Sequence, residues 1–200
     1  MEPLPPKADF PTETVPARDN PFRSARVEAL TFRFDPSQWR VLTDRLVAMD
    51  HRGALVGPKG TGKTTLLTEL ERRLEAEGWR IVRWRLREER KRPTDEELIA
   101  AQSAGPGDLI TVDGAEQLPW LHWRRLRRLS RRCGGLIITT HRPGRLPTLH
   151  GHQTSPELLA DLVSELLERP VSVERIEGLF RVHRGNIRDC LRALYDDCPI

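Results

Sequence analysis

The stretch that decides the fold of this chain reads Gly57-Pro58-Lys59-Gly60-Thr61-Gly62-Lys63-Thr64. A short apolar run at residues 53–56 precedes it, and leucines recur at helical spacing over residues 64–77 behind it. The stretch matches the pattern GxxxxGK[ST] completely, and a strand before it and a helix after it are the context in which that pattern binds phosphate. Glycines let such a loop turn successive N–H groups toward phosphate oxygens without Cβ clashes. The chain is therefore predicted to hold a nucleoside triphosphate at the start of a helix.

The residue types in and beyond the loop predict how nucleotide and metal are held. Lys63 is expected to bridge the β- and γ-phosphates as a point charge, and the Thr64 hydroxyl to ligate Mg²⁺. Thr65 is expected to contact the α-phosphate. Asp113 ends the apolar run at residues 109–112, which predicts the acid that holds Mg²⁺ through water. The expected nucleotide-binding residues are Gly57, Pro58, Lys59, Gly60, Thr61, Gly62, Lys63, Thr64 and Thr65, and the expected cofactors are ATP and Mg²⁺.

The remaining pattern predicts an α/β fold, with a parallel sheet between two layers of helices and a small helical lid at the C-terminal end. Apolar runs alternate with amphipathic segments up to about residue 152, and only helical patterns follow. Strands are expected at 31–34, 53–56, 80–86, 109–112 and 136–139, and helices at 36–49, 64–77, 94–102, 119–132, 157–168, 173–182 and 185–196. The predicted organisation is an arm at residues 1–21, a core at 22–152 and a lid at 153–200.

The arm is rich in proline, which excludes a helix or a central strand there. Residues 20–23 are expected either to pack near the nucleotide base or to belong to a disordered leader. Length, charge and cysteine content are those of one ordinary reduced domain, with 200 residues, a net charge of +4 and three cysteines without metal-ligand spacing. No stretch has the apolar length of a membrane span, so a cytoplasmic protein without membrane contact is expected.

The order of these motifs resembles the additional-strand branch of P-loop ATPases, which includes AAA+ and NACHT-type proteins. One predicted strand separates the loop strand from the Asp113 strand, and another with a polar end follows at residues 136–141. The resemblance implies that this later strand lies between the other two and presents a sensor to the γ-phosphate. Thr140 is the first candidate for that sensor and His141 the second. The resemblance also favours ATP, because no guanine-reading Asn/Thr-Lys-x-Asp motif occurs.

Two further positions follow from the resemblance. In typical AAA+ proteins a glutamate directly follows the metal-binding aspartate, whereas this chain has Gly114 there and Glu116 as the nearest acid. The run is more similar to the Asp-Gly-x-acid variant of NACHT-type switches, which makes Glu116 the candidate general base and indicates slow turnover. The segment at residues 183–188 is similar to the sensor-2 helix of AAA+ lids, and Arg188 aligns with the arginine that senses the γ-phosphate.

Residues 120–133 contain six arginines and no acid, namely Arg124, Arg125, Arg127, Arg128, Arg131 and Arg132. Three interpretations remain open for this segment. It could bind DNA or RNA phosphates, with the tryptophans as stacking groups. One arginine could instead reach the nucleotide of a neighbouring subunit in a homo-oligomer. The third alternative is a solvated face paired with glutamates such as Glu157, Glu165 and Glu168.

The favoured functional class is a Mg-ATP-dependent switch that acts on a protein partner, with Lys63, Glu116, Thr140 and Arg188 as its catalytic residues. A nucleotide-dependent DNA-binding or adaptor protein with little hydrolysis is the main alternative. An ABC-type ATPase is disfavoured because no LSGGQ-like signature precedes Asp113. A kinase is disfavoured because no acceptor-substrate motif is visible.

Overall fold

The computed structural model describes residues 16–197, which divide into two compact units. One unit comprises residues 32–58 and 62–152 and contains the sheet. The other comprises the described residues through Thr31, residues 59–61, and the residues from Gln153 onward. Each unit has its own apolar cluster and is described separately below.

The first unit is built on a five-stranded parallel sheet with the strand order β2-β3-β4-β1-β5. The strand bounds are β1 Arg52–Val56, β2 Arg80–Arg85, β3 Asp108–Asp113, β4 Gly135–Thr140 and β5 Thr148–Gly151. The pairing of β4 with both β1 and β3 confirms that the later strand lies between the loop strand and the Asp113 strand. All strands being parallel, their carboxyl ends lie at one edge of the sheet, where ligands of open α/β sheets bind.

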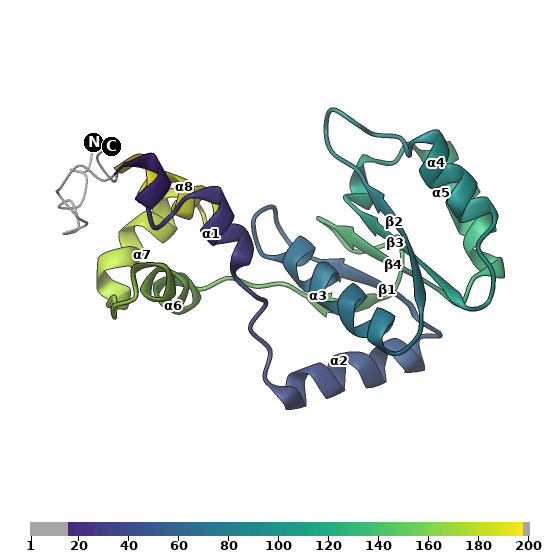
Figure 1. Ribbon diagram of the computed structural model, residues 1–200, viewed down its shortest axis with the longest axis horizontal. Coiled ribbons are helices and arrows are strands. Elements are labelled where there is room, and N and C mark those ends of the chain that lie inside the picture. Colours follow the sequence, from purple (N-terminus) through teal and green to yellow (C-terminus); the bar gives the residue numbers. More distant parts are fainter. Residues whose placement is uncertain (1–15, 198–200) are drawn as a thin grey trace. The chain divides into compact units, whose positions relative to one another are not determined.

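Helices cover both faces of this sheet (Figure 1). On one face, α2 (Pro36–Ala48) and α3 (Lys63–Ala76) contribute Leu42, Leu66 and Leu70 to a core with Leu55 and Ile137. On the other face, α4 (Asp95–Gln102) and α5 (Trp120–Leu129) pack over a core that includes Trp84 and Leu126. The short helices η2 (Ala115–Gln117) and η3 (Ser130–Arg132) flank α5. The α/β class with a parallel sheet and two helical layers is thereby confirmed.

Two elements of this unit differ from expectation. Residues 31–34 form no strand, because Phe32 and Phe34 pack their rings edge-to-face on each other and on His150 instead of entering a backbone ladder. The short strand β5 was not predicted. Its four residues carry only one apolar side chain, Leu149, and become a strand through pairing with β1.

The second unit combines the N-terminal described residues with three C-terminal helices. Its elements are η1 Ala17–Asp19, α1 Ser24–Ala29, α6 Pro156–Leu167, α7 Val173–Val182 and α8 Ile187–Asp197. Phe22 is 3% exposed and packs in the cluster of these helices, and the Asn20 side-chain amide donates to the Tyr195 carbonyl oxygen at 3.1 Å.

The N-terminal boundary of the core therefore differs from the sequence assignment, which placed residues 22–31 in the core. These residues group with the helical unit because the Phe22 ring and the Asn20 amide find their buried partners there. Among residues 20–23, Asn20 and Phe22 make these contacts within the helical unit. The rest of the proposed proline-rich arm, residues 1–15, lies outside the described residues. Among residues 16–197, no helix is long and apolar enough to cross a membrane.

Candidate functional site

The loop before α3 has the backbone geometry of a phosphate-binding loop. Gly60 and Gly62 adopt positive φ angles of 78° and 84°, a region that favours glycine. Gly62 is the N-cap of α3, and no side chain caps the helix, so no side-chain oxygen competes there for the amides of the first turn. These amides and the positive end of the helix dipole form an environment suited to an anion.

Lys63 is the first residue of α3 and is only 8% exposed. Its ammonium group donates to the carbonyl oxygen of Pro58 at 2.6 Å, which directs the side chain back toward the loop. Burying an ammonium requires oxygen partners, since desolvation without them is costly. The loop thus holds a positive charge next to its own amides, the arrangement expected for binding phosphate oxygens.

The Thr64 hydroxyl and the Asp113 carboxylate meet at the carboxyl end of β3. The hydroxyl oxygen lies 3.0 Å from Oδ2 and 3.2 Å from Oδ1 of Asp113, although the two residues are 49 positions apart in the chain. The fold thus gathers a hydroxyl and a carboxylate beside the loop, and such hard oxygen donors suit Mg²⁺. The chemistry of this pair fits the metal expected there.

Thr139 is a site residue that the sequence interpretation missed. Its hydroxyl donates to Oδ1 of Asp113 at 2.7 Å and accepts from the Gly114 N–H at 2.8 Å. Thr139 thereby fixes the orientation of the carboxylate and the start of the following loop. The signal that could have found it is the alternation along β4, in which Thr139 shares the face of Ile137, the side on which α3 lies.

Thr140, the first sensor candidate, points to the opposite face of β4. Its buried hydroxyl donates to the Arg142 carbonyl oxygen at 3.1 Å. A shallow pocket brings it together with Glu116 and His141, and with Arg145, whose pKa is lowered by burial. The structure therefore gathers Thr140, His141 and Glu116 at one place, whereas it is Thr139 that contacts Asp113.

Glu116 and His141 contact each other directly. Oε1 of Glu116 lies 3.1 Å from Nε2 of His141, while Oε2 is buried and has no hydrogen-bond partner among residues 16–197. One carboxylate oxygen of the candidate general base is thus engaged by the second sensor candidate. With Oε1 engaged by His141 and Oε2 buried, neither oxygen of this carboxylate is open to an attacking water in the described arrangement.

Gly114 explains why no glutamate follows Asp113. Its φ angle is +80°, and a Cβ atom placed on it would lie 2.5 Å from the backbone oxygen of Leu86. Any larger residue would require the backbone to move, so the acid can appear only further along, in η2. The backbone conformation at position 114 therefore requires glycine, which accounts for the difference from the AAA+ pattern at this position.

The other sequence candidates are placed as follows. Thr65 is exposed in the first turn of α3. Arg188 is exposed in the first turn of α8, in the helical unit, and its role as a γ-phosphate sensor stays a prediction. Of the arginines in the 120–133 segment, four lie on α5 and two on η3, and all six are exposed.

Comparison with known proteins finds fold similarity only. No family model and no curated protein sequence matches the chain. Solved structures of RuvB from Thermotoga maritima are similar, among them one described as the Holliday junction branch migration motor, with a TM-score of 0.47, 18% identity, and coverage of 78% of this chain and 60% of that chain. A structure of a RuvB variant has a TM-score of 0.47 at 17% identity and covers 82% of this chain and 62% of its own. The chain spans about six tenths of the length of these neighbours.

Proposed function

We propose that this chain binds Mg-ATP at the Gly57–Thr64 loop and hydrolyses it slowly, as a switch coupled to a partner. The observation that carries the proposal is the contact of the Thr64 hydroxyl with the Asp113 carboxylate beside a complete GxxxxGK[ST] loop. Two unrelated sequence signals, one in the loop and one at the end of β3, meet within hydrogen-bonding distance. If the match to the loop pattern were accidental, there would be no reason to expect a carboxylate within hydrogen-bonding distance of Thr64.

The residues of the loop have distinct roles in this proposal. The amides of the loop and of the first turn of α3 bind the phosphate oxygens, and Lys63 neutralises charge between the β- and γ-phosphates. Thr64 and Asp113 hold the metal, and Thr139 keeps the Asp113 carboxylate aimed at it. When bound, Mg²⁺ neutralises the charge that develops on the phosphates.

Slow turnover is supported by the surroundings of the candidate base. Gly114 leaves no acid next to Asp113, and one oxygen of Glu116 is engaged by His141. The Glu116 carboxylate must become accessible, by release of Oε1 from His141 or by exposure of the buried Oε2, before it can orient and deprotonate the attacking water. A conformational change or a binding partner at the pocket of Thr140 and His141 would free the carboxylate. Activity would then depend on that event, as in a molecular switch.

The strand order supports a place in the additional-strand branch, because β4 lies between β1 and β3. The Asp113-Gly114-Ala115-Glu116 run supports the NACHT-like variant within it. Arg188 as a sensor on the lid, and assembly into a homo-oligomer, are further parts of this proposal.

The test is nucleotide binding by the Lys63→Ala variant, followed with a fluorescent ATP analogue in Mg²⁺ and in EDTA. Losing the lysine charge should weaken binding by at least about tenfold, because a charge-assisted contact contributes roughly 1.5–3 kcal/mol. Chelation should weaken binding by the parent as well. Lys91→Ala, an exposed lysine remote from the loop in sequence, is the matched control and should bind like the parent. Equal affinity of the Lys63→Ala variant and the parent would refute the proposal.

A second candidate function is a nucleotide-dependent adaptor that holds ATP with almost no hydrolysis. The engagement of Glu116 by His141 is the observation that favours it. Single-turnover hydrolysis by the parent and by Glu116→Gln separates the two functions. Under the ATPase proposal the parent cleaves ATP and the variant is at least about 100-fold slower, since general bases contribute roughly 10²–10⁴-fold. Under the adaptor alternative both cleave at the same negligible rate.

A further inference from the structure

The exposed side of α5 and η3 carries six arginines, which we call the arginine face: Arg124, Arg125, Arg127, Arg128, Arg131 and Arg132. At about 100° per residue, the four on α5 fall within an arc of roughly 160°. Trp123 and Leu126 occupy the buried side of the same helix. The cationic surface is therefore continuous and separate from the surface that packs on the sheet.

The arginine face is not neutralised by the protein itself. Within residues 16–197 none of its six guanidinium groups lies in an ion pair, and the segment 120–133 contains no acid. Elsewhere in the chain arginines are paired, as Arg80 is with Asp108 and Arg90 with Glu97. Glu168, one of the glutamates that could have paired with this segment, contacts Arg26 instead. Within its own unit, the arginine face therefore has no acidic partner among the described residues.

Two exposed apolar side chains lie on this same side of the helix. Trp120 is 63% and Leu121 is 68% exposed, and the Arg124 guanidinium lies 4.8 Å from the centre of the Trp120 ring. Tryptophan and arginine are the residue types enriched at interaction surfaces. With arginine over one side of the indole, the other side is available for a second planar group.

The segment is also rigidly held on the sheet. Arg52 of β1 donates from Nη2 to the carbonyl oxygens of Ser130 and Cys133, at 2.7 and 3.0 Å. Leu126 is fully buried and Cys133 nearly so. The backbone that carries the arginines is thus fixed on the sheet. This preorganisation lowers the entropic cost of binding a ligand.

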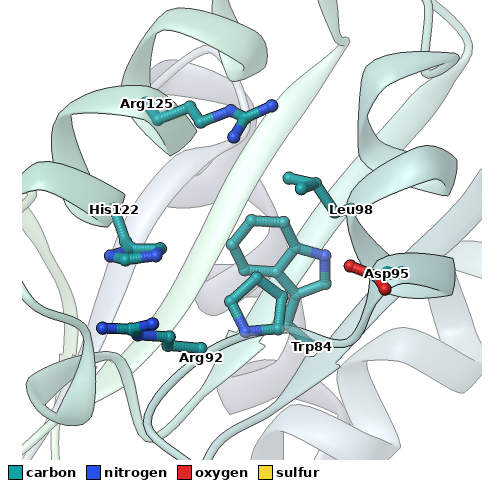
Figure 2. A pocket seen from close by; sticks show the side chains of 7 residues that line it. Trp84, Arg92, Asp95, Leu98, His122 and Arg125 are labelled. Atoms are coloured by element: carbon teal, nitrogen blue, oxygen red, sulfur yellow. The ribbon is translucent and has the colours of Figure 1, made fainter.

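A pocket extends the cationic surface from α5 toward α4 (Figure 2). Arg125 and His122 of α5 line it together with Arg92, and in the view of Figure 2 these three side chains surround the indole of Trp84 on its upper and left sides. Nδ1 of His122 is buried and has no hydrogen-bond partner among the described residues. Asp95 is the single acid of the lining, so cationic and donor groups predominate.

From these observations we propose that the arginine face binds single-stranded nucleic acid, with the guanidinium groups on the phosphates and Trp120 stacked on an unpaired base. Unpaired arginines on a rigid helix match a polyanion with regularly spaced charges, and an exposed indole matches a planar base. Stacking requires a base free of its duplex, which favours a single strand. An anionic membrane, whose interface also accommodates tryptophan, and an acidic protein are the competing ligands, and the experiment below includes both.

The experiment measures binding of a fluorescein-labelled 20-nucleotide oligo-deoxythymidine by anisotropy over a range of salt concentrations. Each phosphate contact contributes about −0.7 to the slope of log affinity against log salt, so Arg124→Gln/Arg128→Gln should reduce the slope by about 1.4. Trp120→Ala should weaken binding by about 5- to 100-fold with little change in slope, because stacking is not ionic. All three substitutions are at exposed positions, so the fold should be retained.

The matched control is Arg40→Gln/Arg72→Gln, which removes the same charge from exposed positions on α2 and α3. It should keep the parent's slope. An equal reduction of the salt slope in the control and in the double variant of the arginine face would overturn the proposal. So would binding of a 20-base-pair duplex more tightly than the single strand, or binding of phosphatidylserine vesicles or polyglutamate in preference to the oligonucleotide.

This inference does not depend on the proposed ATP site, and the measurements are made without nucleotide. The Lys63→Ala variant should bind the oligonucleotide like the parent, and the variant of the arginine face should bind the ATP analogue like the parent. If the arginine variant instead loses ATP hydrolysis while keeping the oligonucleotide, the arginines act on a neighbouring subunit's nucleotide and the proposal fails.

Discussion

Thr139 shows how a single side chain can organise the proposed metal site. Its hydroxyl accepts a hydrogen bond from the Gly114 N–H and donates to Asp113, so it couples the carboxylate to the loop that leads to Glu116. Groups that orient a metal ligand affect metal affinity without touching the metal. We therefore class Thr139 as a positioning residue.

Thr139→Val removes this hydroxyl and preserves the shape of the side chain. We expect the Mg²⁺ concentration needed for half-maximal nucleotide binding to rise by about 10- to 100-fold, because the carboxylate loses its fixed orientation. A titration with Mg²⁺ at constant ATP analogue measures this. Thr140→Val is the adjacent control, since the Thr140 hydroxyl donates to a backbone carbonyl of the following loop. An unchanged Mg²⁺ requirement in Thr139→Val, or an equal rise in both variants, would contradict the assignment.

At the scale of elements, β2 is an edge strand protected by charged side chains. Arg83 and Arg85 reach back to Glu71 of α3, which is 2% exposed and also accepts from the Thr111 hydroxyl. At the start of the strand, Arg80 makes two hydrogen bonds of 2.6 Å to Asp108 of β3. Such charges keep an exposed edge from pairing with another chain. They also connect the helix of the phosphate loop to two strands.

Asp108→Asn tests how much the ion pair of Arg80 and Asp108 contributes to the free energy of unfolding, and how that contribution depends on pH. The hydrogen bonds from Arg80 hold the pKa of Asp108 below its ordinary value, while partial burial acts in the opposite direction. The folded protein therefore binds this proton less readily than the unfolded chain. The ionised carboxylate stabilises the fold above the ordinary pKa of about 3.9, and this contribution is lost as pH falls through the lowered folded value.

We expect Asp108→Asn to lower the urea midpoint of unfolding at pH 7, and the gap to the parent to close below about pH 4. Urea titrations at both pH values, followed by tryptophan fluorescence, measure the two midpoints. Asp44→Asn makes the same charge change at an exposed position of α2 and should leave both midpoints in place. A gap that persists at low pH would mean that the interaction does not depend on the ionised carboxylate.

At the scale of the whole molecule, the described N-terminal residues complete the helical unit. Phe22 packs among Leu159, Ile176 and Leu194, which come from three different helices. The Asn20 side chain is fully buried, accepts from the Phe22 N–H and donates to the end of α8. A unit of three short helices gains a substantial part of its core from a segment far away in the sequence.

Phe22→Ala should therefore destabilise the helical unit by about 3–5 kcal/mol, the usual cost of truncating a buried phenylalanine. Urea unfolding followed by circular dichroism at 222 nm reports on the helices of both units, while the five tryptophans, all within residues 39–123, report on the sheet unit alone, so a transition that shifts in dichroism but not in fluorescence belongs to the helical unit. Val41→Ala on α2, at a position 67% exposed, should change neither signal. An unchanged dichroism transition in Phe22→Ala would show that residues 16–31 add nothing to this core.

The sequence by itself determined the phosphate-type loop, the helices that flank it and four of the five strands, because these depend on local patterns of glycine, charge and apolar spacing. It also placed Asp113 at the end of a strand, while the position of β4 was an expectation from the resemblance to additional-strand ATPases. Alternation along β4 separates Thr139 from Thr140 in the sequence, but only tertiary structure decided which of the two faces α3 and Asp113, since the face of a strand is set by packing. It also decided that β5 forms on β1 and that Phe22 joins the helical unit, because strand pairing and buried contacts connect residues that are distant in the chain.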